Sequence, residues 1–351
     1  PLVYGGNRVR LLQNGDEFFP NLLAAINGAA RSIHFETYIF AQDNIGLRVS
    51  DALAAAADRG VAVRLVVDGF GTGTFAPELK SRLESVGAQV IIFRRTRWWR
   101  LERRLLRRMH RKLVLVDDQL AFAGGINIID DHHHPDPEPA RLGPRFDVAV
   151  VCEGPIVASI ALAMKRLWWT LQLLQGRGRS GPAPALALES IPPPYADGVR
   201  AALLLRDNLR YRRTIESAYM EVIRTAHKEV LIACAYFLPG RTFRKALIDC
   251  VRRGVRVRLL VQGRIEYAIQ HYGQEALYSQ FLEAGVEIHE YETSYLHAKV
   301  AVVDESWATV GSSNIDPYSL LLAREANVAV YDAAFARDLR TALERAIDEH
   351  S

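Results

Sequence analysis

Apolar runs of strand length alternate with helical patterns in both halves of the chain. Two of these runs directly follow a glycine suited to ending a helix, at residues 61–67 and 255–261. Further apolar runs typical of strands occur at residues 32–40, 86–92, 229–238 and 284–288. Strands that alternate with helices predict an α/β fold with a largely parallel or mixed sheet.

The second half of the chain repeats the first. Residues 59–69 and 253–263 share the pattern Arg-Gly-Val-x-Val-Arg-Leu-x-Val-x-Gly. Between the repeats, residues 176–198 are rich in Gly, Pro and Ala, which is typical of a connection rather than of a surface loop within one domain. A chain of 351 residues also suits about two domains of ~150 residues each. We therefore predict lobes at 1–175 and 199–351, joined by a linker at 176–198.

A polar motif occurs once in each half, His-x-Lys-x4-Asp with a Gly-(Gly/Ser)-x-Asn tail. Its residues are His110, Lys112, Asp117 and Asn127 in the first half, and His297, Lys299, Asp304 and Asn314 in the second. Each His-x-Lys opens a strand-like run, and residues i and i+2 of a strand share a face. Each histidine is therefore expected to project beside its lysine. Two matching copies indicate one phosphate-handling site assembled from two halves.

These residue types suit attack on a phosphodiester. The two lysines can offset the negative charge that repels a nucleophile, and the amides of Asn127 and Asn314 can donate to phosphate oxygens. One histidine can attack phosphorus while the other protonates the leaving alcohol, because the unperturbed histidine pKa lies near 6.5. The two roles need opposite protonation states, so the environments must differ or the pair must share a proton. Asp117 and Asp304, at the ends of the strand-like runs, are expected to hold local structure rather than to contact substrate.

The doubled motif resembles the signature of the phospholipase D superfamily, and the likeness covers nearly the whole chain. Residues 108–112, 235–240 and 308–317 look like bacterial cardiolipin synthases, of the type without N-terminal transmembrane helices. The resemblance implies two similar α/β/α lobes with mixed sheets, related by a pseudo-twofold axis. The two motifs would meet at one active site, with no metal and no other cofactor.

The resemblance also assigns roles to individual residues. The catalytic set it implies is His110, Lys112, Asp117, His297, Lys299 and Asp304. His110 is the expected nucleophile, and His297 is the expected acid and later the base. The family places an acidic residue after each Gly-x-x-Asn, and Asp147 and Glu325 fit that place as partners that orient the histidines.

The reaction implied is the synthesis of cardiolipin through a phosphohistidine intermediate. A phosphatidyl group would pass from one phosphatidylglycerol molecule to the hydroxyl of a second. The same motifs would serve a phospholipase D that hydrolyses headgroups to phosphatidic acid, or a phosphodiesterase or nuclease. A lipid-binding protein without activity is disfavoured, because both histidines, lysines and asparagines are present.

The first half carries an insertion before its motif, at about residues 94–109. Placed on a helix, its tryptophans and leucines occupy one arc and its arginines the opposite arc, which is typical of a helix lying at a membrane interface. The expected membrane contacts are Arg97, Trp98, Trp99, Arg100, Leu105 and Leu106. The same pattern would suit a helix packed on its own lobe or, less well, one that binds nucleic acid. Residues 155–175 are a second amphipathic stretch, either a shallow membrane anchor or a core helix.

Composition changes this picture little. The net charge is only +4, so the expected partner is an anionic phospholipid surface met by local basic residues, and not nucleic acid. No apolar run approaches the ~18 residues that span a bilayer. The three cysteines form no disulfide framework and suit a reducing compartment. The expected location is the cytoplasmic side of the bacterial inner membrane, as a peripheral or monotopic protein of undetermined oligomeric state.

Overall fold

The computed structural model describes residues 1–94, 108–133, 142–176, 182–185, 191–207, 211–316 and 323–350. The helices are α1 (Asn14–Gly28), α2 (Asn44–Asp58), α3 (Phe75–Ser85), α4 (Ile156–Leu174), α5 (Thr214–Thr225), α6 (Arg241–Arg252), α7 (Ala268–Glu275), α8 (Tyr278–Glu283) and α10 (Ala333–His350). The strands are β1 (Val3–Gln13), β2 (Ser32–Thr37), β3 (Ala62–Asp68), β4 (Gln89–Phe93), β5 (Arg108–Met109), β6 (Leu113–Val116), β7 (Leu120–Gly124), β8 (Val148–Glu153), β9 (Val199–Arg206), β10 (Glu229–Cys234), β11 (Arg256–Gln262), β12 (Glu287–Tyr291), β13 (Lys299–Val303), β14 (Trp307–Gly311) and β15 (Ala323–Tyr331).

A continuous mixed sheet runs through both halves, in the order β12-β11-β10-β13-β14-β15-β9-β1-β8-β7-β6-β2-β3-β4. The order is symmetric about the antiparallel β1–β9 pair, so that β8 corresponds to β15, β6 to β13 and β2 to β10. In each half the outer three strands are parallel and the others are antiparallel. The predicted mixed α/β fold of two similar halves is confirmed, and the sheets of the two halves prove to be joined.

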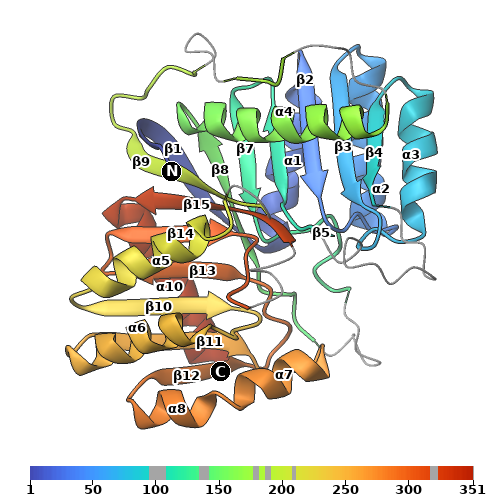
Figure 1. The fold of residues 1–351 in the computed structure, drawn as a ribbon. Helices are drawn as coiled ribbons and strands as arrows, with labels where there is room; N and C mark the ends of the chain where they lie inside the picture. Colours follow the sequence, from blue (N-terminus) through green and yellow to red (C-terminus); the bar gives the residue numbers. More distant parts are fainter. Residues whose placement is uncertain are drawn as a thin grey trace.

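Helices cover both faces of this sheet (Figure 1). In that view α4 crosses in front of the N-terminal strands while α1 and α2 lie behind them. In the C-terminal half α5 and α6 lie in front and α10 lies behind. A single hydrophobic cluster contains residues of α4 and of α10 together with strands of both halves. The halves therefore share a core as well as a sheet.

Glycines end helices at equivalent places in the two halves. Gly60 and Gly254, which precede β3 and β11, have φ of +88° and +83°. Gly87 and Gly285, which precede β4 and β12, both have φ of +88°. Only glycine adopts this region without steric cost, so the repeated Gly stops predicted from the sequence are confirmed.

The two amphipathic stretches have different outcomes. Helix α4 buries ten side chains, including that of Trp168, and is therefore a core helix. The expected membrane contacts Arg97, Trp98, Trp99, Arg100, Leu105 and Leu106 lie outside the described residues. No described helix is long and apolar enough to span a membrane. The division into 1–175, 176–198 and 199–351 stays a prediction, with α4 ending at Leu174 and β9 starting at Val199.

The first motif aspartate ties two strands together. Asp117 occupies the turn after β6 with φ of +54°. Its carboxylate accepts hydrogen bonds from the backbone N–H groups of Ala30, Arg31 and Ser32, at 2.9, 2.7 and 2.8 Å. Burial alone would raise the pKa of Asp117, but these backbone donors lower it overall. The start of β2 is thereby held beside the end of β6.

The second motif aspartate repeats the arrangement. Asp304 follows β13 with φ of +53°. It accepts from the N–H groups of His227, Lys228 and Glu229 at 2.7, 2.7 and 3.0 Å, where β10 begins. Here too burial acts to raise the pKa of the carboxyl and the backbone donors lower it overall.

We expect Asp117→Ala to lower the free energy of unfolding by about 2 kcal/mol, because three backbone donors lose a charged acceptor. The folded-state pKa of Asp117 is lowered, so its stabilisation is fully present above the unfolded value of about 3.9 and is lost as pH falls through the folded value. Urea unfolding of the wild type and of Asp117→Asn should therefore differ at pH 7 and converge in acid.

The matched control is Asp58→Ala, at the exposed end of α2, which should unfold like the wild type. Equal stability of Asp117→Ala and Asp58→Ala at pH 7 would contradict the structural role.

Candidate active site

The first motif histidine is held by the opposite half of the molecule. Strand β5 pairs with the start of β15 in parallel, and the His110 N–H donates to the carbonyl of Arg324 at 3.0 Å. This pairing places the His110 ring beside the next side chain of β15. Nδ1 of His110 lies 3.1 Å from Oε1 and 3.2 Å from Oε2 of Glu325, and 3.2 Å from the carbonyl of Ser312.

The second motif histidine makes the reciprocal contact. The His297 N–H donates to the carbonyl of Phe146 at 2.8 Å, just before β8. Nδ1 of His297 then lies 2.5 Å from Oδ2 of Asp147. Each histidine is therefore paired with a carboxylate of the other half. This leaves Nε2 of each ring as the nitrogen that can face a substrate.

The motif lysines and asparagines are buried. Nζ of Lys112 donates to the carbonyl of His110 at 2.9 Å, and Nζ of Lys299 donates to the carbonyl of His297. Asn127 and Asn314 are 3% and 7% exposed, too buried to be ordinary surface amides. The charge of each lysine acts on the other, and the charge of His110 acts on His297. The structure thus brings the histidines, lysines and their carboxylate partners into one cluster.

Burial dominates the electrostatics of this cluster. It lowers the pKa of His110 and holds that of His297 well below its usual value. Burial likewise lowers the pKa of Lys299 and takes that of Lys112 to about 7. An approaching phosphate would reverse these shifts, since a nearby negative charge favours the protonated forms. The site is therefore electrostatically prepared for an anionic group.

The two carboxyl groups differ. Burial raises the pKa of Asp147 to about 7, even though the charge of Lys299 opposes the shift. Burial acts to raise the pKa of Glu325 as well, but His110, Lys112 and the Ser312 hydroxyl lower it overall. Near neutral pH Glu325 is ionised, while Asp147 holds a proton for part of the time.

The charge and hydrogen bond of His110 contribute most to the lower pKa of Glu325, and one position of the repeat adds to the difference. The motif tail has Gly125 in the first half and Ser312 in the second, and both backbones pair with the adjoining strand. Ser312 Oγ donates to Glu325, which favours the ionised carboxylate. A side chain at Gly125 would overlap Oδ1 of Asp147, so this carboxyl has no equivalent hydroxyl donor.

Two site residues were missed by the sequence argument. Oδ2 of Asp68, the last residue of β3, accepts from the N–H of Met109 at 2.9 Å. Oε1 of Gln262, the last residue of β11, accepts from the N–H of Leu296 at 2.5 Å. Each acceptor thus holds the residue just before a motif histidine. The signal was present, because both residues end the repeated pattern immediately before its final glycine.

The motif aspartates are not part of the cluster. Asp117 and Asp304 follow β6 and β13, whereas the histidines precede these strands. The five residue steps from lysine to aspartate along an extended strand span roughly 16 Å. The geometry therefore does not favour direct contact of Asp117 and Asp304 with substrate, and their place in the catalytic set stays a prediction. Their contacts at the starts of β2 and β10 account for them instead.

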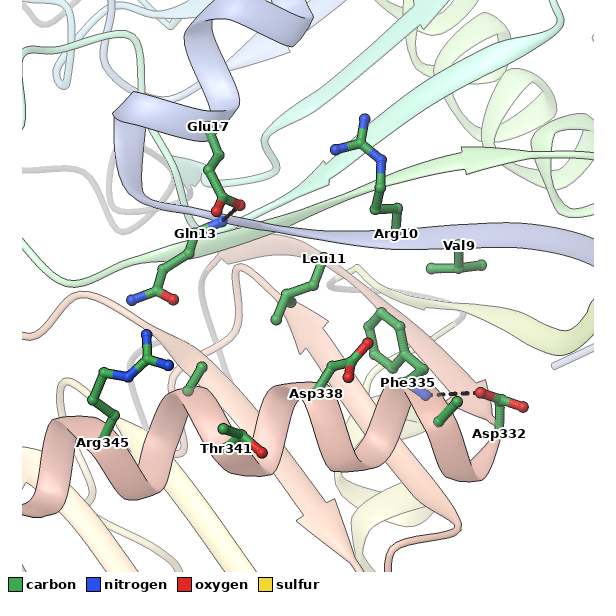
Figure 2. Close-up of a pocket in the computed structure, with 12 residues that line it drawn as sticks. Val9, Arg10, Leu11, Gln13, Glu17, Asp332, Phe335, Asp338, Thr341 and Arg345 are labelled. Carbon is green, nitrogen blue, oxygen red and sulfur yellow. Dashed lines mark hydrogen bonds between the residues drawn. The ribbon is translucent and has the colours of Figure 1, made fainter.

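Other features of the described residues lie apart from the phosphate chemistry. Among these residues no three His, Cys, Asp or Glu side chains are grouped to hold a metal ion. A cavity of ≈ 390 Å³ lies between β1, α1 and α10, lined by Arg10, Glu17, Asp338 and Arg345 among others. Figure 2 shows acidic and basic side chains around it, and none of its lining residues belongs to the histidine cluster.

Comparison with known proteins gives consistent matches. The family described as "Cardiolipin synthase, PLD-like domain" matches residues 22–140 and 219–347. The chain is 37% identical over 350 residues to cardiolipin synthase B of Shigella flexneri, covering 95% of this chain and 79% of that protein. It is 38% identical over 354 residues to cardiolipin synthase B of Salmonella typhimurium, covering 97% of this chain and 80% of that protein.

Solved structures support the fold. The crystal structure of phosphatidylserine synthase from Haemophilus influenzae matches with a TM-score of 0.73 at 13% identity, over 97% of this chain and 86% of that chain. Polyphosphate kinase from Porphyromonas gingivalis matches with a TM-score of 0.60 at 14% identity, over 96% of this chain and 46% of that chain. At such identities the likeness concerns the fold alone.

We expect Gln262→Ala to lower kcat by about 10–100-fold with little change in KM, because the backbone before His297 loses its anchor and the ring shifts. Gln262→Glu should recover most of the rate, since Asp68 shows that a carboxylate serves at the equivalent position. The test is to measure the steady-state kinetics of both variants. An unchanged kcat in Gln262→Ala would contradict the role of Gln262 in positioning His297.

Proposed function

Because this chain belongs to the family of cardiolipin synthases with phospholipase D-like domains, we propose that it makes cardiolipin from two molecules of phosphatidylglycerol. The observation that carries the proposal is the pair of partly buried histidines, each bound through Nδ1 to a carboxyl group of the opposite half. Together with two buried lysines, this arrangement suits a two-step transfer of a phosphatidyl group.

In the first step Nε2 of His110 attacks phosphorus and the bond from phosphorus to the headgroup glycerol breaks. His297 gives its Nε2 proton to the departing glycerol oxygen, and the proton on Asp147 passes to Nδ1 of His297. The product is a phosphatidyl group bonded to His110. Its imidazolium charge is balanced by Glu325, and its phosphate oxygens lie among Lys112, Lys299 and the two asparagines.

In the second step the terminal hydroxyl of another phosphatidylglycerol gives its proton to Nε2 of His297. The resulting oxygen attacks phosphorus, the bond from phosphorus to His110 breaks, and cardiolipin leaves. The proton on Nδ1 of His297 returns to Asp147, which restores the starting state. Water in place of the second lipid would yield phosphatidic acid, the product of a phospholipase D.

The difference between the carboxyl groups supports this assignment of roles. An ionised Glu325 accepts from Nδ1–H of His110 and leaves Nε2 with a free lone pair, as a nucleophile requires. A protonated Asp147 donates to Nδ1 of His297 and leaves the proton on Nε2, as an acid requires. Opposite protonation of the two partners therefore selects opposite tautomers of chemically identical rings.

Phospholipid substrates reach such a site from a membrane surface. We place the enzyme on the cytoplasmic side of the bacterial inner membrane, as a peripheral or monotopic protein on anionic phospholipid. The arginines and tryptophans of residues 94–109 support this location, since such residues favour anionic headgroups. Nucleic acid is not among the proposed partners.

The proposal is tested by incubating the purified protein with phosphatidylglycerol vesicles, without added metal, and identifying the products by mass spectrometry. We expect cardiolipin and glycerol in equal amounts. We expect no product from His110→Ala, which lacks the nucleophile, or from His297→Ala, which lacks the group that donates and accepts the proton. Phosphatidic acid alone would indicate hydrolysis instead, and robust activity of either variant would refute the mechanism.

The pH dependence of kcat tests the assignment of tautomers. The pKa of Asp147 in the free protein is about 7. The proton that Asp147 shares with His297 is therefore present below this pH and is lost above it. We expect kcat to fall in alkaline solution with an inflection above pH 7, because bound phosphate also favours the protonated form of Asp147, and this inflection to disappear in a slower Asp147→Asn variant. Bound phosphate keeps Lys112 protonated, so the kcat profile reports the His297–Asp147 pair rather than the lysine.

We expect Glu325→Gln to lower kcat by about 10³–10⁴-fold, because an amide that donates to Nδ1 of His110 places the proton on the attacking nitrogen. Asp332→Asn is its control, a carboxyl outside the cluster whose side chain accepts from the N–H of Phe335. A Glu325→Gln variant as active as this control would show that the tautomer of His110 does not depend on Glu325.

A further inference from the structure

A short segment of the C-terminal half exposes its large apolar side chains. Ile265, Tyr267, Ile269 and Tyr272, in α7 and the loop before it, are 52%, 57%, 82% and 59% exposed. Isolated exposed apolar residues are normal on soluble proteins, but four within eight positions form a patch.

Several polar side chains of the same segment point inward, although Glu275 at the end of α7 is exposed. Gln274 is the buried residue of α7, and its side chain accepts from the N–H of Phe237 at 3.0 Å. Glu266 accepts from the Tyr236 hydroxyl, and the His271 side chain is only 10% exposed. A helix on a water-exposed surface has the opposite pattern, with apolar residues inward and polar residues outward. The outward face of α7 is therefore suited to an apolar environment.

This patch lies beside the phosphate site. The rings of Tyr267 and Tyr236 are in edge contact with centroids 5.9 Å apart, and Tyr236 follows β10 by two residues. The charge of Arg145 acts on both Tyr236 and His297. In Figure 1, α7 lies at the end of the sheet toward which β10 points. A lipid with its phosphate among the histidines would thus have α7 nearby.

The N-terminal half contributes a smaller apolar feature at the equivalent strand end. Phe70 follows β3 by two residues, as Arg264 follows β11, and its side chain is 54% exposed. The guanidinium of Arg108 lies 4.2 Å from the centre of the Phe70 ring. Aromatic and aliphatic groups beside arginine are the composition that the headgroup region of an anionic bilayer favours.

We propose that the outward face of α7, formed by Ile265, Tyr267, Ile269 and Tyr272, docks on an anionic phospholipid bilayer and holds the phosphate site at the membrane surface. The proposal rests on the proposed function, because a substrate with two acyl chains must keep those chains in the bilayer while its phosphate reaches the histidines. A second protein is the less suited occupant, since the face lies near the phosphate site that the lipid must reach.

The test compares flotation with vesicles of phosphatidylglycerol and phosphatidylcholine for the wild type, Ile269→Ser/Tyr272→Ser and the control Leu282→Ser. Leu282 is 55% exposed on α8, just before β12, and so lies at the opposite end of the parallel strands. We expect the double variant to bind vesicles at least about tenfold more weakly, because two large side chains no longer enter the interface. The control should bind like the wild type.

A second measurement reports contact directly and does not depend on turnover. Ile269→Cys and Leu282→Cys are labelled with an environment-sensitive fluorophore, which is practicable because Cys152, Cys234 and Cys250 are buried. We expect fluorescence to rise several-fold with vesicles at position 269 and to stay constant at 282. Equal responses at both positions, or unchanged flotation of the double variant, would overturn the proposal.

Activity separates this proposal from the proposed function. The double variant should lose turnover of vesicle phosphatidylglycerol but keep turnover of a short-chain, monomeric phosphatidylglycerol. Absence of turnover in the wild type with both substrates would refute the function, while flotation and fluorescence would still decide the docking face. If the double variant lost turnover of both substrates equally, α7 would contribute to the reaction itself. That result would overturn its role as a docking face.

Discussion

The contact between each histidine and a carboxyl group of the opposite half is the constraint on which the rest of this structure depends. It can form only if β5 reaches β15 and Leu296 reaches Phe146, which requires the two halves to be packed against each other. The continuous sheet through β1 and β9 and the shared core hold them in that position. Without its carboxyl partner, neither histidine ring would be held in one tautomer or in one orientation. Neither half therefore contains a complete site.

The same arrangement turns a symmetric scaffold into an asymmetric catalyst. A duplicated fold supplies two similar histidines, yet the proposed chemistry needs one nucleophile and one acid. His110 and Lys112 lower the pKa of Glu325, and the exchange of glycine for serine at positions 125 and 312 adds to the difference, because only Ser312 donates to its neighbouring carboxyl group. In the proposed mechanism Asp147 carries a proton and Glu325 does not. This difference makes His297 the acid and His110 the nucleophile. Small differences matter here because the buried, low-dielectric cluster amplifies them.

The asymmetry extends to the surface around the site. The N-terminal half carries the basic, tryptophan-containing insertion before its motif, and the C-terminal half exposes the apolar face of α7 after β11. Both features follow strands that end on the same edge as the histidines. Meanwhile the far ends of the motif strands, held by Asp117 and Asp304, maintain the scaffold.

The sequence by itself determined the repeat, the mixed α/β class, the glycine stops and the chemistry-bearing residues. These depend on local periodicity, on backbone conformations that only glycine adopts easily, and on spacings along single strands. It also identified Asp147 and Glu325, but not which histidine each would hold. Only the tertiary structure decided that these pairs cross between halves, that Asp68 and Gln262 anchor the motif backbones, and which backbone groups Asp117 and Asp304 hold. Those outcomes depend on which strand ends meet after folding, and on burial that shifts pKa values in opposite directions, neither of which is encoded in any local pattern.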